Sequence, residues 1–223
     1  SDITGAILAR GFHADLYENF TDVDAIFSAN PSIVNDPQPI KRMTYREMRE
    51  LSYAGFSVFH DEALIPAIEG NIIVNVKNTH APEKPGTLIV PDQGFHPEQI
   101  VTGIAGGKHY AALYLHKYLL NREAGFTLKI LEILNKYGLP YEHMPSGIDD
   151  ITIIFDRKLI SDDLVQKLCD EVRATVNPDS LEWIDDYAVI MVVGEGMFNR
   201  VGVAAGIFTE LAEHNIRISM INQ

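Results

Sequence analysis

The stretch GFTLKILEILNKYGLPYEHM, residues 125–144, has a counterpart in GVAAGIFTELAEHNIRISMI, residues 202–221. Few residues are identical, but the stretches align without a gap, and apolar residues recur every three to four positions in both, as on one face of a helix. The matched pairs are Phe126 and Val203, Ile130 and Ile207, Leu134 and Leu211, and, in the strand that follows each helix, Tyr141 and Ile218. The alignment predicts an internal repeat of a helix followed by a strand.

Segments with strand and helix patterns surround the first copy of this repeat in the order strand, helix, strand, strand, helix, strand. The strands are expected at 109–116, 139–144, 150–156 and 187–194, and the helices at 125–138 and 161–176. This β-α-β-β-α-β order is that of the ferredoxin-like split βαβ unit. We therefore expect one ferredoxin-like module at 99–186 and a second, truncated one at 187–223.

The first part of the chain, residues 1–92, follows a different plan. Helical patterns alternate with short strands rich in β-branched residues, which indicates an α/β layer with at least some parallel pairing. Thr44 and Glu47 form the T-x-x-E pattern of a capping box and mark the start of one helix. The stretch PDQGFHPE, residues 91–98, has two prolines, a glycine and no apolar periodicity, so it is the expected domain boundary.

Composition narrows the class of protein. The net charge is −13 and no basic stripe is present, so nucleic acid is not an expected partner. Cys169 is the only cysteine, which excludes an intramolecular disulfide and fits a reducing compartment such as the cytoplasm. No apolar run approaches the roughly 20 residues that span a bilayer, so no membrane partner is expected. Both ends of the chain lie inside patterned stretches, and we interpret it as a fragment.

Two glycine-rich stretches resemble nucleotide-binding loops only loosely. GIAGGK, residues 103–108, has neither the spacing nor the following Ser or Thr of a Walker loop, and a bend between strands is expected there. GEGMFNRVG, residues 194–202, has its third glycine out of register for a dinucleotide loop, and we interpret it as a turn between a strand and a helix. The histidines form no H-E-x-x-H pattern, and no metal site is predicted.

Polar residues directly follow the expected strand 16–20, in the sequence ENFTDVD at 18–24. In open α/β sheets, ligands bind outside the carboxyl ends of the strands, and this places Thr21 and Asp22 at a binding crevice. Asp and Thr are also frequent turn formers. The spacing alone leaves both interpretations open.

Four segments occur in an order that resembles a known family. They are SDITGAILA at 1–9, YENFTDVDAIFSANPSIV at 17–34, MTYREMRELSYAGFSVFHDEALIPA at 43–67, and VNVKNT with PGTLI between 74 and 89. In this order they resemble the C-terminal half of the kinase domain of aspartate kinases, which belong to the amino-acid-kinase family. Residues 99–223, including EHMPSGIDDITIIF and the final IRISMINQ, resemble the ACT regulatory modules that follow that domain.

The resemblance implies an ATP site. In the family, a Thr-Asp pair at the strand end lies against the ATP nucleoside, so Thr21 and Asp22 are the matching positions. Phe27 stands where many members have Tyr, which removes a hydroxyl and keeps a stacking face. Ser32 and Ser57 stand where many members have Arg and Lys near the phosphates, so those charges have to come from elsewhere.

The resemblance also implies a reaction. Ser1 and Asp2 match the Gly-Ser-Asp motif in which Ser contacts aspartate and Asp organises the reacting centre. The γ-phosphoryl group of ATP moves to the side-chain carboxylate of aspartate, with Mg²⁺. The family's phosphate-binding Lys lies in an N-terminal Gly-rich motif that this chain lacks, so the chain by itself is expected to be inactive. The alternative is a non-catalytic ACT-type module that senses an amino acid.

Regulation is a further implication, with lysine the expected effector. The matching positions are Phe126 and Thr127 at the first ACT helix start, and Tyr141 and Glu142 on the next strand. Helix N–H groups suit the carboxylate of an amino acid, and Glu142 suits its amine. For Phe126 a place in the core is an equally good interpretation. The apolar ACT strands need cover, so we expect a homo-oligomer through residues 99–223.

Overall fold

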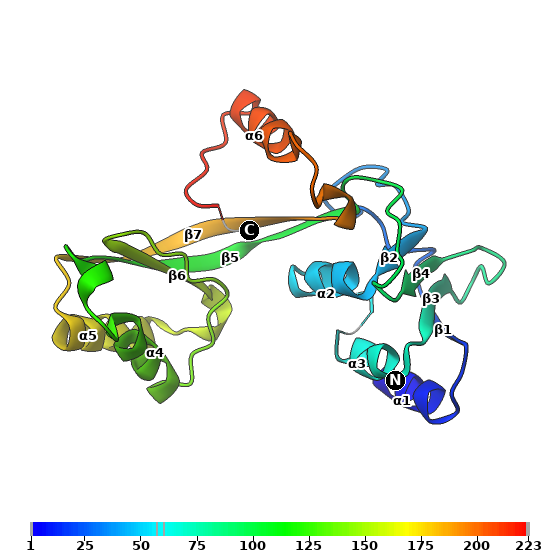
Figure 1. Ribbon diagram of the computed structural model, residues 1–223, viewed down its shortest axis with the longest axis horizontal. Coiled ribbons are helices and arrows are strands. Elements are labelled where there is room, and N and C mark those ends of the chain that lie inside the picture. The colour runs from blue at the N-terminus through cyan, green and yellow to red at the C-terminus, as the bar shows by residue number, and fades with distance from the viewer. Residues whose placement is uncertain (1, 57, 60, 222–223) are drawn as a thin grey trace. The chain divides into compact units, whose positions relative to one another are not determined.

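The computed structural model of the protein describes residues 2–56, 58–59 and 61–221. The chain forms two compact units, coloured along the sequence in Figure 1. Unit 1 comprises Ser1–Gly106 and Ile190–Arg217, and unit 2 comprises Gly107–Val189 and Ile218–Gln223. The chain therefore passes from one unit to the other three times. Within the described ranges, no helix combines the length and the apolar character needed to cross a bilayer.

Unit 1 contains a four-stranded sheet in the order β1-β3-β4-β2. The strands are β1 (Leu16–Thr21), β2 (Arg42–Thr44), β3 (Ile73–Asn78) and β4 (Thr87–Val90). β1 is parallel to β3 and β2 is parallel to β4, whereas β3 and β4 are antiparallel. The expected α/β layer with parallel pairing is confirmed. Because β1 and β3 run in parallel, their last residues, Thr21 and Asn78, are register partners at one edge of the sheet.

Three helices accompany this sheet, namely α1 (Asp2–Gly11), α2 (Tyr45–Tyr53) and α3 (Asp61–Gly70). α2 starts at the predicted capping box. The Thr44 hydroxyl accepts a hydrogen bond from the Glu47 backbone N–H at 3.1 Å, and Glu47 Oε2 accepts one from the Thr44 N–H at 2.8 Å. On the next turns Met48 and Leu51 are fully buried, so α2 is held by its cap and by its apolar face.

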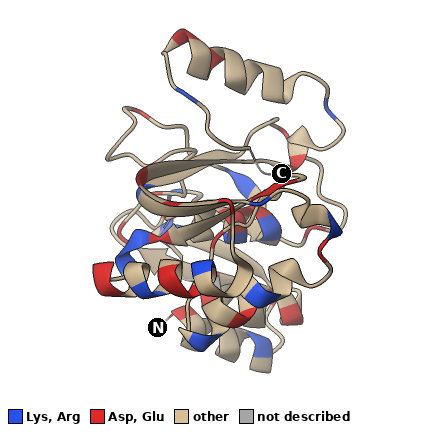
Figure 2. Ribbon diagram, turned by 90° about the vertical axis from the view of Figure 1, so that its left-hand side faces the viewer, with Lys and Arg blue, Asp and Glu red and all other residues tan. Residues whose placement is uncertain are grey.

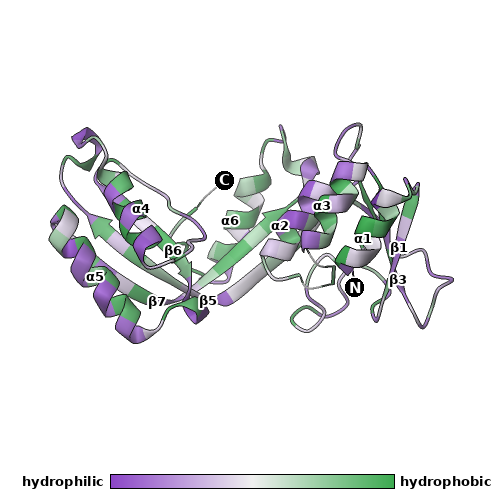
Figure 3. Ribbon diagram, turned by 90° about the horizontal axis from the view of Figure 1, so that it is seen from below, coloured by the Kyte–Doolittle hydropathy of each residue, from purple (hydrophilic) through white to green (hydrophobic). Residues whose placement is uncertain are grey.

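Unit 2 is built on a three-stranded sheet in the order β6-β5-β7, covered by two helices. Its elements are α4 (Phe126–Lys136), β6 (Asp150–Asp156) and α5 (Asp162–Val176), together with most of β5 (Gly103–His116) and β7 (Ser180–Val193), whose other ends belong to unit 1. Leu113 and Phe155 of the sheet pack with Ile130 of α4 and Val172 of α5 in one buried cluster. Figure 3 shows hydrophilic residues on α4 and α5 alternating with the hydrophobic ones that form this core.

Two sequence expectations for unit 2 are wrong. Residues 139–144 do not form a continuous strand, and only isolated bridges such as His143 to Ile154 remain. Pro140 lies within the segment and Pro145 directly follows it, and neither supplies an N–H, which leaves too few donors for a full ladder. The GIAGGK stretch is not a bend, because it forms the first part of β5.

The second copy of the repeat is only partly formed. Its helix, α6 (Val203–Glu213), begins after Gly202, just as α4 begins after Gly125, and both glycines are left-handed. No residue of α6 is buried, however, whereas the matching positions in α4 are. The strand expected around Ile218 is absent, so the described part of the chain offers no sheet partner on which α6 packs as α4 does.

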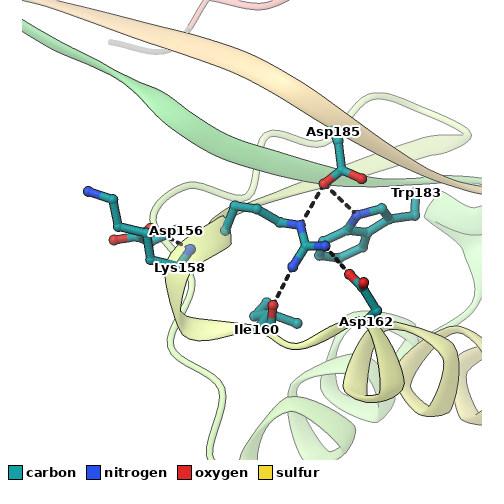
Figure 4. A network of polar contacts seen from close by, with 7 residues as sticks. Asp156, Lys158, Ile160, Asp162, Trp183 and Asp185 are labelled. Atoms are coloured by element: carbon teal, nitrogen blue, oxygen red, sulfur yellow. Dashed lines mark hydrogen bonds and ion pairs between the residues drawn. The ribbon is translucent and has the colours of Figure 1, made fainter.

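A polar network ties the short 3-10 helix after β6 (η2, Arg157–Leu159) to α5 and β7 within unit 2 (Figure 4). The Arg157 guanidinium donates to the Ile160 carbonyl oxygen and the Asp162 carboxylate, and its Nε donates to Asp185 Oδ1 at 2.7 Å. The same Asp185 oxygen accepts the indole N–H of Trp183 at 3.1 Å. The Trp183 ring also stacks on the buried Phe155 ring, 5.6 Å away between centroids, so this tryptophan reports on the unit 2 core.

Candidate functional site

The first candidate site lies at the carboxyl ends of β1 and β3. Thr21 is the last residue of β1, and its hydroxyl donates to Asp22 Oδ1 at 3.2 Å. The Thr21 carbonyl oxygen accepts hydrogen bonds from Thr79 N at 2.8 Å and from Thr79 Oγ1 at 3.0 Å. The loop that follows β1 is thus held against the loop that follows β3. Asp22 is exposed and Thr21 half-buried, so both polar side chains are accessible at this edge.

Two contacts that the sequence analysis did not predict, from Asn78 and Lys84 to Asp24, hold the same loop in place. Asp24 accepts a hydrogen bond from Asn78 Nδ2 at 2.6 Å and forms an ion pair with Lys84 Nζ at 2.5 Å. These contacts, that of Lys84 first, hold the pKa of the Asp24 carboxyl below its ordinary value. Lys84 therefore brings a cation to the edge that carries Thr21 and Asp22. Lys84 and Asp24 are distant in sequence, and only the parallel pairing of β1 with β3 hints that their loops meet.

Among the other predicted ATP positions, Phe27 is half-buried and its backbone forms a bridge with Pro39. The Ser32 hydroxyl and backbone N–H both donate to Asn30 Oδ1, at 2.8 Å and 2.9 Å. Ser32 thus has a local turn role in an exposed loop and brings no charge there. Ser57 lies outside the described residues.

Asp2, the predicted catalytic residue, is the first residue of α1 and lies next to β1. Asn19 Nδ2 donates to Asp2 Oδ1 at 3.2 Å and to the Tyr17 hydroxyl at 2.9 Å. The Tyr17 hydroxyl donates to the Asp2 carbonyl oxygen at 3.3 Å. Asn19 is 7% exposed, so this amide fixes the Asp2 carboxylate from inside the fold. Ser1 lies outside the described residues.

The second candidate site lies at the start of α4 in unit 2. Phe126 is only 2% exposed and packs in the unit 2 core. Lys117 Nζ lies 5.2 Å from the centroid of its ring and 2.9 Å from Glu123 Oε2. Glu123 also pairs with Lys129 at 2.7 Å, and the two lysines, Lys129 first, hold the pKa of the Glu123 carboxyl below its ordinary value. Thr127 is half-buried on the first turn.

Tyr141 and Glu142 occupy the bridged segment before β6. Tyr141 is 41% exposed, and the Glu142 backbone N–H donates to the Ile154 carbonyl oxygen at 2.8 Å. The Glu142 charge lies near Tyr110, whose pKa is raised by burial and, second, by this carboxylate. Tyr110 belongs to a different apolar cluster from Phe126. Phe126 and Thr127 thus lie at the start of α4, Tyr141 and Glu142 lie before β6, and the effector role of all four stays a prediction.

A third polar group lies on the sheet of unit 2. Asp150 Oδ1 accepts a hydrogen bond from the Tyr114 hydroxyl at 2.5 Å and contacts His116 Nδ1 at 2.7 Å. These contacts, that of Tyr114 first, lower the pKa of the Asp150 carboxyl, and the same bond raises the pKa of the Tyr114 phenol. Asp150 and His116 are register partners on β6 and β5, so the trio stabilises the strand pair.

Figure 2 shows acidic and basic residues interspersed along the helices. Within the described ranges, no group of three or more His, Cys, Asp or Glu side chains is arranged to hold a metal ion.

Comparisons with known proteins bear on both units. Residues 1–78 match the amino acid kinase family, and residues 190–223 match an ACT domain. Aspartokinase 3 of Bacillus subtilis (strain 168) is 49% identical over all 223 residues, which cover 49% of that protein. The crystal structure of Clostridium acetobutylicum aspartate kinase, described as an allosteric enzyme, is 44% identical, with a TM-score of 0.95 over 100% of this chain and 51% of that one.

A further match is the crystal structure of E. coli aspartokinase III in complex with lysine and aspartate, at 25% identity and a TM-score of 0.78. It covers 100% of this chain and 49% of that one. The chain thus spans about half the length of each of these three relatives.

Proposed function

Given that the chain resembles aspartokinases along its whole length, we propose that it is part of an aspartate kinase that carries the nucleotide-binding side of the kinase domain and an ACT regulatory region. The enzyme transfers the γ-phosphoryl group of ATP to the side-chain carboxylate of L-aspartate and yields 4-phospho-L-aspartate and ADP. The observation that carries this proposal is the 49% identity to Aspartokinase 3 of B. subtilis. This identity extends over all 223 residues and therefore includes both regions.

The chemistry requires positioning and charge neutralisation more than covalent catalysis. Thr21 and Asp22 lie at the carboxyl ends of parallel strands, where a nucleoside binds, and Phe27 supplies a stacking face. Asp2, held by Asn19, orients the reacting groups, and Ser1 contacts the aspartate substrate.

Mg²⁺ is part of the proposal because it neutralises charge on the phosphates of ATP. Mg²⁺ usually keeps several waters and takes one or two carboxylates plus substrate phosphates, so it needs no cluster of protein ligands. The described residues, which offer no such cluster, fit this mode. With Ser32 and Ser57 uncharged, Lys84 is a cation that this chain itself brings to the nucleotide edge.

The regulatory part of the proposal is inhibition by lysine. It is supported by the crystal structure of E. coli aspartokinase III, which was solved in complex with lysine and aspartate. The N–H groups at the start of α4, near Phe126 and Thr127, suit the carboxylate of the effector. Glu142 suits its amine, and the exposed Tyr141 offers a wall for its methylenes. A homo-oligomer through the ACT region and a cytoplasmic location complete the proposal.

The test uses a chimera in which this chain replaces the matching half of the B. subtilis relative, with the chain alone as the matched control. A coupled assay measures release of ADP. We expect turnover that depends on aspartate in the chimera and none in the chain alone. A folded chimera that binds lysine but never turns over aspartate would instead support a non-catalytic amino-acid sensor.

A further inference from the structure

A buried carboxylate in unit 1 joins three separate segments of the chain. Glu47, on the first turn of α2, is 1% exposed. Its Oε2 accepts the N–H of Thr44 at 2.8 Å, and its Oε1 accepts both the Thr102 hydroxyl at 2.6 Å and the Glu195 N–H at 2.8 Å. Within the described ranges, no Lys, Arg or His forms an ion pair with it. Hydrogen bonds alone therefore satisfy this carboxylate, and each of its donors matters.

The Thr102 and Glu195 donors lie on two short segments, residues 99–102 before β5 and residues 194–196 after β7, which we call the strand roots. Thr102 directly precedes β5, and Glu195 follows shortly after the end of β7. β5 and β7 are neighbours in one sheet and run side by side in Figure 1. β5 passes from unit 1 into unit 2, and β7 returns from unit 2 into unit 1. Glu47 therefore contacts the unit 1 end of both strands.

The two strand roots are packed too closely to slide past one another. The Thr102 N–H donates to the Val193 carbonyl oxygen at 2.8 Å. A Cβ at Gly194 would lie 2.4 Å from the carbonyl oxygen of Ile100, and one at Gly196 would lie 2.1 Å from that of Gln99. Only glycine permits this approach at either position. The two roots are therefore in direct backbone contact, and both donors to Glu47 Oε1 lie on this packed pair.

On its other side, Glu47 controls the start of α2. Its Oε2 completes the capping box, so the orientation that the carboxylate takes toward the strand roots also sets the cap. α2 ends at Tyr53 and leads through the buried Phe56 to the chain before α3. That connection contains Ser57, which the family resemblance places beside the phosphates of ATP.

We propose that Glu47 is a positioning residue that couples the regulatory unit to the kinase site through the cap of α2. Its carboxylate holds the roots of β5 and β7 with one oxygen and the helix start with the other. An effector bound in unit 2 changes the kinase site by altering this junction. The direction of the signal rests on the proposed function, whereas the junction itself does not.

The first test uses hydrogen exchange on the whole chain. Glu47→Gln keeps the size of the side chain but replaces one acceptor oxygen with an NH₂ donor, so it cannot accept from all three partners. Glu50→Gln removes the same charge from an exposed position of the same helix and is the matched control. In E47Q we expect exchange at the Thr44 and Glu195 amides to rise at least about tenfold, with E50Q unchanged.

Thr102→Val removes a single donor and leaves the capping box intact, so it covers the case in which E47Q fails to fold. We expect faster exchange at Glu195 in this variant as well. An unchanged Glu195 amide in both E47Q and T102V would overturn the junction, and so would equal effects of E47Q and E50Q.

The second test measures lysine inhibition of the B. subtilis chimera. In E47Q we expect turnover without lysine to stay within about twofold, and the lysine concentration for half-inhibition to rise by about tenfold or more. E50Q keeps the original inhibition. A merely structural role for Glu47 would lower turnover and leave the lysine response unchanged, and that result would refute the coupling. A chimera without any activity would count against the proposed function, and the exchange experiment would still decide the junction.

Discussion

The repeated helix allows a matched pair of substitutions, Ile130→Ala in α4 and Ile207→Ala in α6. The two positions align in sequence, but Ile130 is 0% exposed in the unit 2 core and Ile207 is only half-buried. The same chemical change therefore removes atoms from a closed core in one copy and from an open helix face in the other.

The size of the effect follows from burial. Deleting the side chain of a fully buried Ile removes its transfer free energy and leaves a cavity, which costs about 2 to 5 kcal/mol. At the complete burial of Ile130 we expect about 3 kcal/mol. A small domain loses roughly 4 to 8 °C of Tm per kcal/mol, so the melting temperature of unit 2 should fall by more than about 10 °C. For Ile207→Ala we expect less than about 1 kcal/mol.

The fluorescence of Trp183 suits this measurement because it is the only tryptophan and its ring stacks on Phe155 in the unit 2 core. Urea titrations of the whole chain and of both variants give the loss of stability from the shift in midpoint at constant slope. Trp183 reports on unit 2, so an equal midpoint shift for Ile207→Ala would show that α6 packs on the unit 2 core as α4 does. A loss below about 1 kcal/mol for Ile130→Ala would refute the description of the core.

Three further outcomes are expected. Thr44→Ala removes the capping box of α2 and should cost about 1 kcal/mol in urea titrations, whereas Ser161→Ala should cost less because the Ser161 side chain makes no capping bond to α5. Hydrogen bonds from Tyr114 and then His116 lower the pKa of the Asp150 carboxyl. Its contribution to stability is therefore complete above the ordinary Asp pKa of about 3.9 and is lost as pH falls through the lowered value. Asp150→Asn should flatten this acid limb of a stability–pH profile, and an unchanged limb would count against the contacts of Asp150 with Tyr114 and His116. Lysine at a hundredfold excess over its dissociation constant should add about 2.7 kcal/mol in a melting scan, and a shift that survives Glu142→Ala would remove Glu142 from the site.

Local signals in the sequence predicted the features that depend on neighbouring residues. The capping box at Thr44 and the helix starts after Gly125 and Gly202 were visible in this way. The strand expected at 139–144 is absent because Pro140 within it and Pro145 directly after it supply no N–H donors, which outweighs the β-pattern of the side chains.

The sequence did not predict contacts between residues that are far apart along the chain. Glu47 meets Thr102 and Glu195 across sequence separations of 55 and 148 residues, and Lys84 meets Asp24 across 60. No local periodicity encodes such pairs, because they depend on how strands and loops are placed by the whole fold. The sequence thus predicted the position of Thr21 at the end of β1 and not the contacts that hold the loops around it.

The most direct test of the central claim is detection of the acyl phosphate itself. Hydroxylamine converts a carboxyl-phosphate anhydride into a hydroxamate and releases phosphate, so it distinguishes phosphoryl transfer to aspartate from hydrolysis of ATP. In the B. subtilis chimera, supplied with ATP, Mg²⁺ and L-aspartate, the account predicts aspartate hydroxamate in an amount equal to ADP, and its loss in Asp2→Asn. Release of ADP without hydroxamate from the folded chimera would contradict an aspartate kinase.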